Sequence, residues 1–399
     1  MAAVHPGPEA PSETGVALCR DPDAFAALGP EWDRLHRACS AATPFQSHAW
    51  LHSWWLSYGA AGRLRVLLAR REGRLVGAAP LMLVHRPMPL LVPLGGAISD
   101  YGDVVVDEEH APAALAALAR GLERVARHAV VDLREVRPGA AAERLYALWP
   151  GPRARLEDSV CMELPAVPVE ELVTRMAANR AQRVRAKLRK LDALGITARS
   201  VPAEEVPEGV GRLLRLHERQ WRGRGVNIEH LRPRFHDHLV RAVGAMVPAG
   251  QATLTEFTLD GGVVAAGLTL RAGRLGGGYL YGADPVLRER KADVATMLLR
   301  EDAREAARSG AAVLSLLRGA EPYKNHWRPN TVTSGRLLLS RPALEPLLRL
   351  HESRARMRER AADVVRSRLP AAREWRGRFN DWRAEGVSVR TGGGGPSER

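Results

Sequence analysis

Two stretches of seventeen residues in this chain are similar to each other in sequence, although they lie far apart. Residues 67–83 read LLARREGRLVGAAPLML, and residues 254–270 read LTEFTLDGGVVAAGLTL. They align without a gap at an offset of 187 positions, and six positions are identical. In each copy apolar residues alternate with others on both sides of a turn that contains glycine, which predicts a β-hairpin. A repeat at this distance predicts two copies of a whole domain.

The sequence around each hairpin predicts the same series of elements. Helical periodicity precedes the hairpins at residues 22–39 and 49–58, and again at 207–223 and 231–247. A strand, a helix and a strand follow them, at 96–106, 111–128 and 130–136 in the first half and at 276–283, 293–309 and 311–317 in the second. Both halves therefore predict a mixed α/β domain. The division that we expect is an N-terminal domain at 16–150, a linker with a basic helix at 151–194, a second domain at 195–342, and an arginine-rich helical extension with a disordered tail at 343–399.

The composition argues against several classes of protein. The 399 residues include three cysteines, Cys19, Cys39 and Cys161, which are too few and too dispersed for a disulfide framework or a metal cluster. The most apolar stretch, residues 88–98, is too short and too interrupted by proline and glycine to span a bilayer. The first residues do not resemble a signal peptide. We therefore expect a cytoplasmic protein without a bound metal.

The basic residues are concentrated in one predicted helix. The chain has a formal net charge of +14, and residues 175–190 contain seven Lys or Arg and no acid. Such a stripe attracts phosphate groups, a tRNA or an acidic protein surface. The plainer alternative is a solvated helix face. At helical spacing Arg180, Arg183 and Lys187 share one side of the helix, with Arg185 and Arg189 beside them.

A group of ionisable residues follows the last predicted strand of the second half. That strand ends near Arg318, and Glu321, Tyr323 and Lys324 come within the next six residues. Pro322 suits the first turn of a helix, where its missing N–H costs nothing. We therefore predict that a helix begins here, and that its dipole helps Tyr323 to lose a proton. A surface helix cap with solvated charges is the alternative.

Several short motifs occur along the chain in one order. They are PFQSHAW at 44–50 with Trp54-Trp55, SDY at 99–101, HERQW at 217–221 with Gly225, YGADP at 281–285 and RGAEPYK at 318–324. With these motifs the chain resembles, over residues 16–339, the bacterial GNAT acyltransferase subfamily often labelled cellulose-biosynthesis acetyltransferase-like. That subfamily is itself similar to the FemAB-type tandem GNAT proteins. The resemblance implies a tandem GNAT fold, which is an α/β fold of two mixed-sheet domains, and an N-acyltransferase without a tightly bound cofactor.

The resemblance also implies a place for the acyl donor. In GNAT enzymes the donor pyrophosphate lies on a [QR]-x-x-G-x-[GA] turn, which corresponds here to residues 290–295, with Asp293 in place of the glycine. A carboxylate there repels a pyrophosphate, so phosphopantetheine on an acidic acyl carrier protein is expected as the donor ahead of free acyl-CoA (coenzyme A). Capping of the following helix by Asp293 is the alternative. The residues assigned to the donor are Arg288, Arg290, Lys291, Ala292, Asp293, Arg318 and Lys324.

Amide-forming acyl transfer requires few protein groups. An amine must lose a proton and attack a thioester carbonyl, while the oxyanion and the leaving sulfur are stabilised. The chain has no G-x-S-x-G elbow, which agrees with direct attack. In GNAT enzymes a tyrosine after the fifth strand protonates the leaving thiolate, and Tyr323 holds that position. The candidate catalytic residues are Tyr323, Glu321, Tyr281 and Glu256, and the candidate acceptor-binding residues are Asp100, Tyr101, His217 and Trp221, of which Asp100 and His217 are further candidates for the base.

Two other functions stay open. A FemAB-like transferase would take its group from aminoacyl-tRNA, which the basic helix suits as well as it suits a carrier protein. A catalytically silent binding module would explain the altered pyrophosphate turn, but the retained Arg318, Tyr323 and Lys324 argue against it. Transfer of an acyl group from a carrier-bound or CoA thioester to an amine is the function that we predict.

Overall fold

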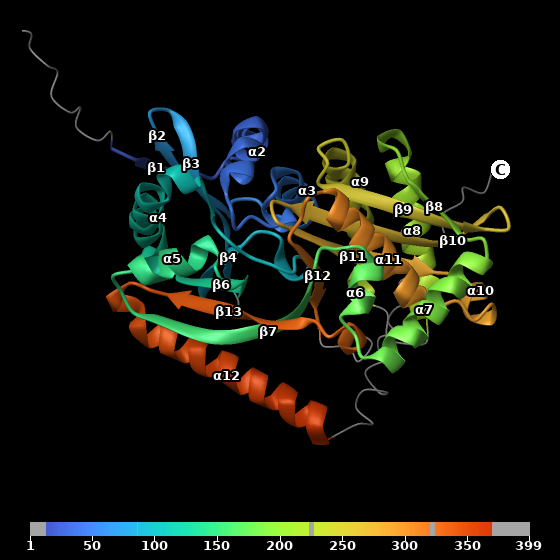
Figure 1. Cartoon of the computed structure of the whole chain (residues 1–399). Helices are drawn as coiled ribbons and strands as arrows, with labels where there is room; N and C mark the ends of the chain where they lie inside the picture. Colours follow the sequence, from blue (N-terminus) through green and yellow to red (C-terminus); the bar gives the residue numbers. More distant parts are fainter. Residues whose placement is uncertain (1–12, 86, 223–226, 320–323, 369–399) are drawn as a thin grey trace, which may run out of the picture. The chain divides into compact units, whose positions relative to one another are not determined.

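The computed structural model describes residues 13–85, 87–222, 227–319 and 324–368 (Figure 1). The chain forms two compact units and passes between them several times. Unit 1 contains Met1–Leu51, Gly59–Asp158 and Ser334–Leu350, and unit 2 contains His52–Tyr58, Ser159–Thr333 and His351–Arg399. The predicted tail beyond residue 368 lies outside the described residues.

Unit 1 is built on a mixed sheet. Its strands lie in the order β1-β2-β3-β4-β6-β13, with β5 beside β3. The pairings are antiparallel, except that β4 and β6 are parallel. The strands are β1 (Gly15–Cys19), β2 (Leu64–Arg71), β3 (Arg74–His85), β4 (Pro89–Pro93), β5 (Val105–Val106), β6 (Val130–Val136) and β13 (Asn330–Leu339). The helices are α1 (Pro22–Ala26), α2 (Gly29–Ala38), the beginning of α3 (His48–Tyr58), α4 (Ala111–Val125) and α5 (Ala141–Leu148).

Helix α4 supplies much of the core of unit 1. Its leucines Leu115, Leu118 and Leu122 recur at a spacing of three and four, which places them on one face. All three are buried among the side chains of β2, β3 and β6. This core explains why the predicted helix and the strands around it form as expected.

The later residues of strand β13, from Ser334 on, belong to unit 1, although we expected them in the second domain. They pair with β6, where Gly335 faces Val136. The guanidinium of Arg336 donates two hydrogen bonds to the carboxylate of Asp132, at 2.7 and 2.5 Å. Both side chains are largely buried, so the pair helps to fix this late segment onto the sheet.

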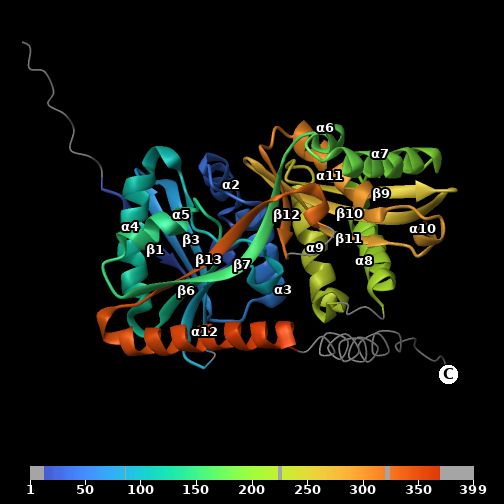
Figure 2. The same cartoon turned by 60° about the horizontal axis from the view of Figure 1, so that its bottom comes forward.

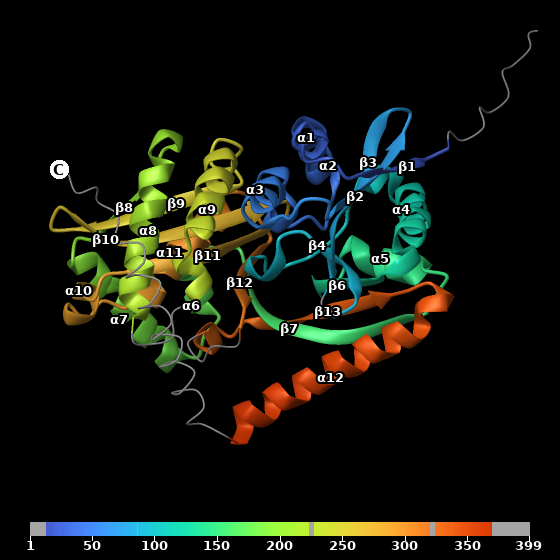
Figure 3. The ribbon, with the colours of Figure 1, turned by 180° about the vertical axis from the view of Figure 1, so that it is seen from behind.

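Unit 2 contains a further set of strands with mixed pairings. Its strands lie in the order β12-β11-β10-β9-β8, and the later residues of β7 pair with β12. Helices α8 and α9 cover one face (Figure 3), and α11 and α7 cover the other (Figures 1 and 2). The strands are β7 (Arg153–Pro165), β8 (Thr197–Ser200), β9 (Ala252–Leu259), β10 (Gly262–Ala272), β11 (Leu275–Ala283) and β12 (Val313–Arg318). The helices are α6 (Val169–Thr174), α7 (Ala178–Ala193), α8 (Val206–Trp221), α9 (Pro233–Met246), α10 (Val286–Glu289) and α11 (Val294–Arg308), while α12 (Glu345–Arg368) begins in unit 1 and continues into unit 2.

The repeated sequence forms a hairpin in each unit, as predicted. The turns Glu72-Gly73 and Asp260-Gly261 both have positive φ angles, of 50° and 77° and of 51° and 80°. Two-residue turns of this kind match the twist of the strands that they join. The second turn comes one position later than the gapless alignment places it. For that reason Leu67 faces Ala79, whereas Leu254 faces Leu268.

Two local expectations were wrong. Residues 96–106 do not form one strand, because Gly95 and Gly96 have positive φ angles of 97° and 53° and turn the chain away from an extended course. The helix expected after Pro322 is replaced by a 3-10 turn of four residues, η7 (Lys324–Trp327). Pro329 follows and disfavours helical backbone before it, and β13 begins at the next residue. Tyr323 itself lies outside the described residues, and the described residues between Lys324 and β13 form no α-helix whose dipole could act on it.

The described residues were compared with the requirements of a membrane-spanning helix and of a metal site. Within the described ranges no helix is both long and apolar enough to cross a bilayer. The same part of the chain contains no group of three or more His, Cys, Asp or Glu placed to hold a metal. The three cysteines are free thiols.

Candidate active site

Strands β11 and β12 part in the middle of the sheet of unit 2. Their parallel register runs from Leu275 opposite Val313 to Gly277 opposite Ser315. Gly277 permits this close approach, because a Cβ atom there would collide with the carbonyl oxygen of Ser315. Beyond Gly277 no residue of β11 pairs with any described residue of β12. Within the described part of the chain, the second half of β11 therefore has no neighbouring strand on that side, and ligands of α/β proteins often bind at such a break.

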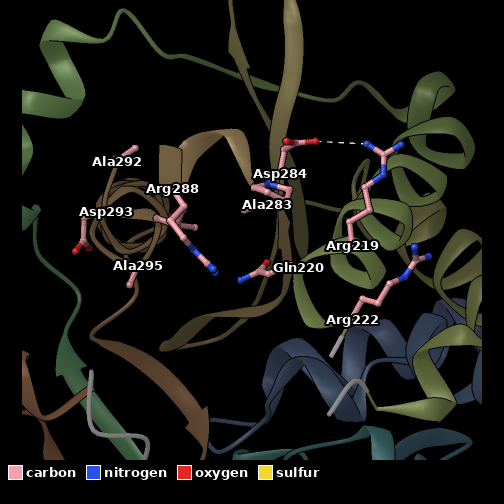
Figure 4. A pocket seen from close by; sticks show the side chains of 11 residues that line it. Arg219, Gln220, Arg222, Ala283, Asp284, Arg288, Ala292, Asp293 and Ala295 are labelled. Carbon is pink, nitrogen blue, oxygen red and sulfur yellow. Dashed lines mark hydrogen bonds and ion pairs between the residues drawn. The ribbon is translucent and has the colours of Figure 1, made fainter. Parts of the chain in front are cut away.

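A pocket of about 460 Å³ lies at the end of β11 (Figure 4). This volume is in the range of sites that bind small molecules. Its walls come from the last turn of α8, the residues after β11, α10 and the first turn of α11. The lining residues are Arg219, Gln220 and Arg222 with residues 283–285, 288 and 292–295.

The pocket is rich in positive charge. Arg219 is paired with Asp284 and Arg222 with Glu218, at N···O distances of 3.4 and 3.0 Å. Arg288 has no acidic partner among the described residues, and Figure 4 shows that its guanidinium extends into the pocket. The pocket can therefore offer one uncompensated guanidinium, beside a helix start, to an anionic group.

Asp293 lies at the start of α11 and has two partners. Its carboxylate is the N-cap of the helix and accepts a hydrogen bond from the Thr296 N–H at 2.9 Å. The ammonium of Lys187, on α7, is 2.6 Å from the same carboxylate. Burial alone would raise the pKa of Asp293, but the hydrogen bonds from Lys187 and Thr296 lower it below its ordinary value. Asp293 is thus an ionised cap whose charge is balanced within unit 2.

The sequence of this region matches a known family. The family model of the acetyltransferase (GNAT) domain matches residues 177–325, from the N-cap of α7 into η7. The match includes the parted strands and the whole pocket. Residues 177–325 are a GNAT acetyltransferase domain. The protein is accordingly an acyltransferase, as predicted. The comparison with curated proteins found no match to this chain.

Solved structures with a similar fold cover most of both units. FemX aligns with a TM-score of 0.57 at 14% identity, over 81% of this chain and 98% of FemX. The C-terminal domain of a putative lysylphosphatidylglycerol synthetase from Agrobacterium fabrum aligns with a TM-score of 0.51 at 11% identity, over 86% and 97% of the two chains. L-PGS from Bacillus licheniformis gives 0.50 at 12% identity, over 84% and 96%. The predicted tandem GNAT fold is confirmed, and the narrower cellulose-biosynthesis assignment stays a prediction.

The residues predicted to hold the donor have different surroundings. Arg288, Ala292 and Asp293 line the pocket. Arg290 pairs instead with Asp260 in the turn between β9 and β10, at 3.2 Å. Lys291 is exposed, in a backbone conformation with φ of 52°.

Lys324 and Arg318 lie next to the end of β12. The ammonium of Lys324 donates hydrogen bonds to the carbonyl oxygens of Arg318 and Gly319, at 2.9 and 3.1 Å. Lys324 is buried, and these contacts join η7 to the end of β12. The ammonium of Lys324 is thus directed to these two carbonyl groups.

Glu256 is buried between two arginines. Its carboxylate accepts hydrogen bonds from Arg199, at 2.7 Å, and from Arg212. These contacts join β9 to β8 and α8. Both oxygens of this carboxylate are occupied by guanidinium groups, so the geometry favours a structural role for Glu256.

Three of the other predicted residues come together in unit 2. The Nδ1 atom of His217 is 2.7 Å from the carbonyl oxygen of Tyr281. The ring of Trp221 lies 6.2 Å from that of His217 and 6.4 Å from that of Tyr281, measured between centroids. These residues surround the contact between the end of α8 and the end of β11.

The remaining candidates are not part of this group. Glu321 and Tyr323 lie outside the described residues. Asp100 and Tyr101 belong to unit 1. Tyr101 is buried against Phe45, and its carbonyl oxygen accepts a hydrogen bond from Gln46.

Several pocket residues were not chosen from the sequence. Arg219 and Gln220 belong to the HERQW motif, and Asp284 belongs to YGADP. Both motifs were recognised, but only their aromatic and imidazole residues were selected. The signal was therefore present in the motifs, whereas Arg222 lies just beyond the first of them.

Proposed function

We propose that the protein transfers an acyl group from a phosphopantetheine thioester to an amine by direct attack of the amine, and that it acts in the cytoplasm. The supporting observation is the parting of β11 and β12 beside an arginine-lined pocket. A pantetheine arm is long and ends in a phosphate. Its chain suits the second half of β11, and its phosphate suits Arg288 and the N-terminal turn of α11.

The reaction needs two proton transfers and no covalent intermediate on the enzyme. The lone pair of the amine forms a bond to the thioester carbonyl carbon, and the C–S bond breaks from the resulting oxyanion. The proposed base is Glu321, which takes the proton of the amine, and the proposed acid is Tyr323, which protonates the departing thiolate. Tyr281, His217 and Trp221 are proposed to border the acceptor in unit 2. Asp100 and Tyr101 remain proposed acceptor residues of unit 1.

The charges of the pocket favour a carrier-bound donor. Free CoA brings a pyrophosphate and a further phosphate, whereas carrier-bound phosphopantetheine brings one phosphodiester. The pocket offers one guanidinium without an acidic partner among the described residues, while the positive charge of Lys187 is already balanced by Asp293 at the helix start. One phosphodiester matches this balance better than three phosphate groups do.

Transfer from aminoacyl-tRNA is the second candidate function. The observation in its favour is the exposed basic face of α7, which lies in the same domain as the pocket. Nucleic acid and an acidic protein both satisfy such a face. The two functions differ in the donor, which is a thioester in one and aminoacyl-tRNA in the other. The donor that the protein uses therefore distinguishes them.

Intact-mass analysis with three donors tests the proposal. The purified protein is incubated with acetyl carrier protein, acetyl-CoA or aminoacyl-tRNA, each with the same mixture of a lysine peptide and glucosamine. We expect acetylated amine from both thioesters and faster transfer from the carrier. Tyr323→Phe should lower turnover about 10²-fold and leave donor affinity nearly unchanged. Transfer from aminoacyl-tRNA alone would contradict the proposal, and donor binding without any transfer would indicate a silent binding module.

A further inference from the structure

A chain of side-chain hydrogen bonds ends on the carbonyl oxygen of Tyr281. Asn227 Nδ2 lies 3.2 Å from His230 Nε2, and His230 Nδ1 lies 3.0 Å from His217 Nε2. The last link is His217 Nδ1, 2.7 Å from the Tyr281 oxygen. His230 belongs to η6 (Ile228–Leu231), Asn227 is its N-cap, and His217 lies on α8. The chain therefore joins three separate elements of unit 2.

The inner end of the chain determines where its hydrogens lie. A carbonyl oxygen can only accept a hydrogen bond, so His217 must carry its hydrogen on Nδ1. In a neutral ring the other nitrogen, Nε2, then has a lone pair and accepts. The hydrogen between the two rings must consequently belong to Nδ1 of His230.

The outer end of the hydrogen-bond chain, at Asn227, independently places the hydrogen of His230 on Nδ1. The Oδ1 atom of Asn227 accepts a hydrogen bond from the Glu229 N–H at 3.1 Å, which fixes the orientation of the amide. The Asn227 amide therefore presents its NH₂ group to His230 Nε2, and that nitrogen must accept. In a neutral ring the hydrogen of His230 is again on Nδ1. All hydrogen bonds of the chain point from Asn227 toward Tyr281.

This order exists only while both rings are neutral. A proton added to His217 would place two N–H groups face to face between the rings, and one added to His230 would do the same against Asn227. Burial lowers the pKa of both histidines, and for His230 it does so, with the neighbouring His217, to about 3. The ring of His230 also stacks on Phe235 at a centroid distance of 4.6 Å.

Few other charged groups are described around the hydrogen bonds of Asn227, His230 and His217. Glu229, in η6, is the acidic group nearest to His230, and it favours protonation of that ring. Its own carboxylate is paired with Arg234 at 2.6 Å and with Arg232 at 3.5 Å. Tyr281 of β11, Trp221 of α8 and Phe235 of α9 supply the remaining described ring contacts. The negative charge beside the chain is therefore largely balanced.

We propose that Asn227, His230 and His217 are positioning residues that hold the end of α8 and the end of β11 together beside the pocket. This inference rests on the proposed function of that pocket. Gln220 follows His217 by one helical turn, and Ala283 comes two residues after Tyr281, and both line the pocket. The backbones meet here, because a Cβ atom at Gly282 would collide with the backbone nitrogen of His217.

The same geometry argues against either histidine of this hydrogen-bond chain as the base of the reaction. Each imidazole nitrogen either donates or accepts within the chain, so none is vacant to take a proton from the acceptor amine. The three residues thus take no proton from the substrate, and they influence the reaction by holding the pocket walls, which includes the place of His217 beside the acceptor.

Nitrogen NMR of the histidine side chains tests the hydrogen-bond chain without any substrate. In uniformly ¹⁵N-labelled protein we expect His217 and His230 to be neutral with the hydrogen on Nδ1, and to stay so from pH 7.5 down to about pH 5. His217→Gln and His230→Asn spectra assign the two signals. A hydrogen on Nε2 of either ring, or titration of either ring near pH 6.5, would overturn the proposal.

A pair of substitutions at His230 separates hydrogen bonding from packing. His230→Phe keeps an aromatic ring against Phe235 but has no donor, whereas His230→Asn keeps an N–H near the position of Nδ1 but loses the ring. With acetyl-CoA and acetyl carrier protein as probes in calorimetry, we expect affinity to fall about tenfold for His230→Phe and much less for His230→Asn. His236→Phe, at a half-exposed position of α9, is the matched control and should leave affinity unchanged.

The opposite order of the two variants would show that packing alone matters and would overturn the proposal. Thermal unfolding of each variant confirms that the protein is folded at the temperature of the measurement. If the wild-type protein binds neither thioester, the proposed function fails. The NMR result still decides whether the chain exists as described.

Discussion

A single side chain, Asp293, shows how a residue that looks wrong for a family is accommodated. In the sequence it replaces the glycine expected where a pyrophosphate binds, and repulsion and helix capping were both open explanations. The structure shows the cap, and it adds the ion pair with Lys187. No pattern in the sequence links these two positions, because the pair depends on the packing of α7 against α11. The two explanations are therefore not exclusive, since a cap can still carry its charge.

Two substitutions separate the charge of Asp293 from its capping role. Asp293→Asn keeps an oxygen that caps the helix, and Asp293→Ala removes both the cap and the charge. We expect both to raise kcat/KM for acetyl-CoA several-fold, with little change for the acetyl carrier protein. Only the alanine variant should lose stability through the cap, by about 1 kcal/mol. Steady-state rates and denaturant unfolding measure the two effects, and a wild-type preference for free acetyl-CoA would refute the charge argument.

Among the elements, helix α7 has two clearly different faces. Ala181, Val184, Leu188 and Leu191 are buried against the side chains of α11 and the sheet. The other face is exposed, and Arg185, Arg189 and Lys190 have no acidic partner among the described residues. Lys187 is different, because it is occupied by Asp293. The basic stripe predicted from the sequence is therefore shorter by one residue as a surface for a partner.

A charge reversal that spares Lys187 tests this surface. Changing Arg183, Arg185 and Arg189 together to Glu should weaken binding of the acidic acetyl carrier protein at least tenfold, because attraction becomes repulsion. Binding to the wild-type protein should also weaken as salt rises. The control is Arg120, Arg124 and Arg127 changed to Glu, which gives the same charge change on exposed positions of unit 1. Equal affinities of the two triple variants, measured by calorimetry, would mean that α7 has no special part in docking.

The sequence predicted those elements whose pattern is local. The helices α4, α8 and α11 and the two hairpins follow from periodicity and turn residues, and they form where they were expected. The segment at 96–106 and the turn η7 were missed because backbone conformation there is decided by Gly95, Gly96 and Pro329 and not by alternation of apolar residues. In the site, Arg219 was visible in a motif, whereas the partnership of His217 with His230 requires two elements to meet.

At the scale of the whole molecule, the two units are interleaved along the chain. Unit 1 takes the later part of strand β13 from residues that follow almost all of unit 2. Local pattern cannot reveal this arrangement, since the alternation of side chains along a strand does not identify the neighbours of that strand. We therefore expect that a cut within the predicted division at 151–194 would not give two complete domains.

Fragments test this conclusion directly. Residues 1–158 alone lack β13 and the partner of Asp132, so we expect a lower melting temperature and a broader transition than for the same fragment joined by a Gly/Ser linker to residues 330–350. Circular dichroism during heating measures both. The linked fragment with Arg336→Leu is the control for the ion pair, and it should fall between the two. Equally cooperative melting of residues 1–158 without β13 would show that the late strand is dispensable.

The interleaving also means that paired segments of unit 1 are synthesised at different times. Asp132 and Arg336 are 204 residues apart. At ordinary rates of translation, this distance corresponds to roughly 10–40 s between the synthesis of the two partners. During that interval the emerging polypeptide presents β6 with one unpaired edge, and such an edge readily captures other extended chains. We therefore expect ribosome-associated chaperones to protect the edge of β6 until β13 has been synthesised.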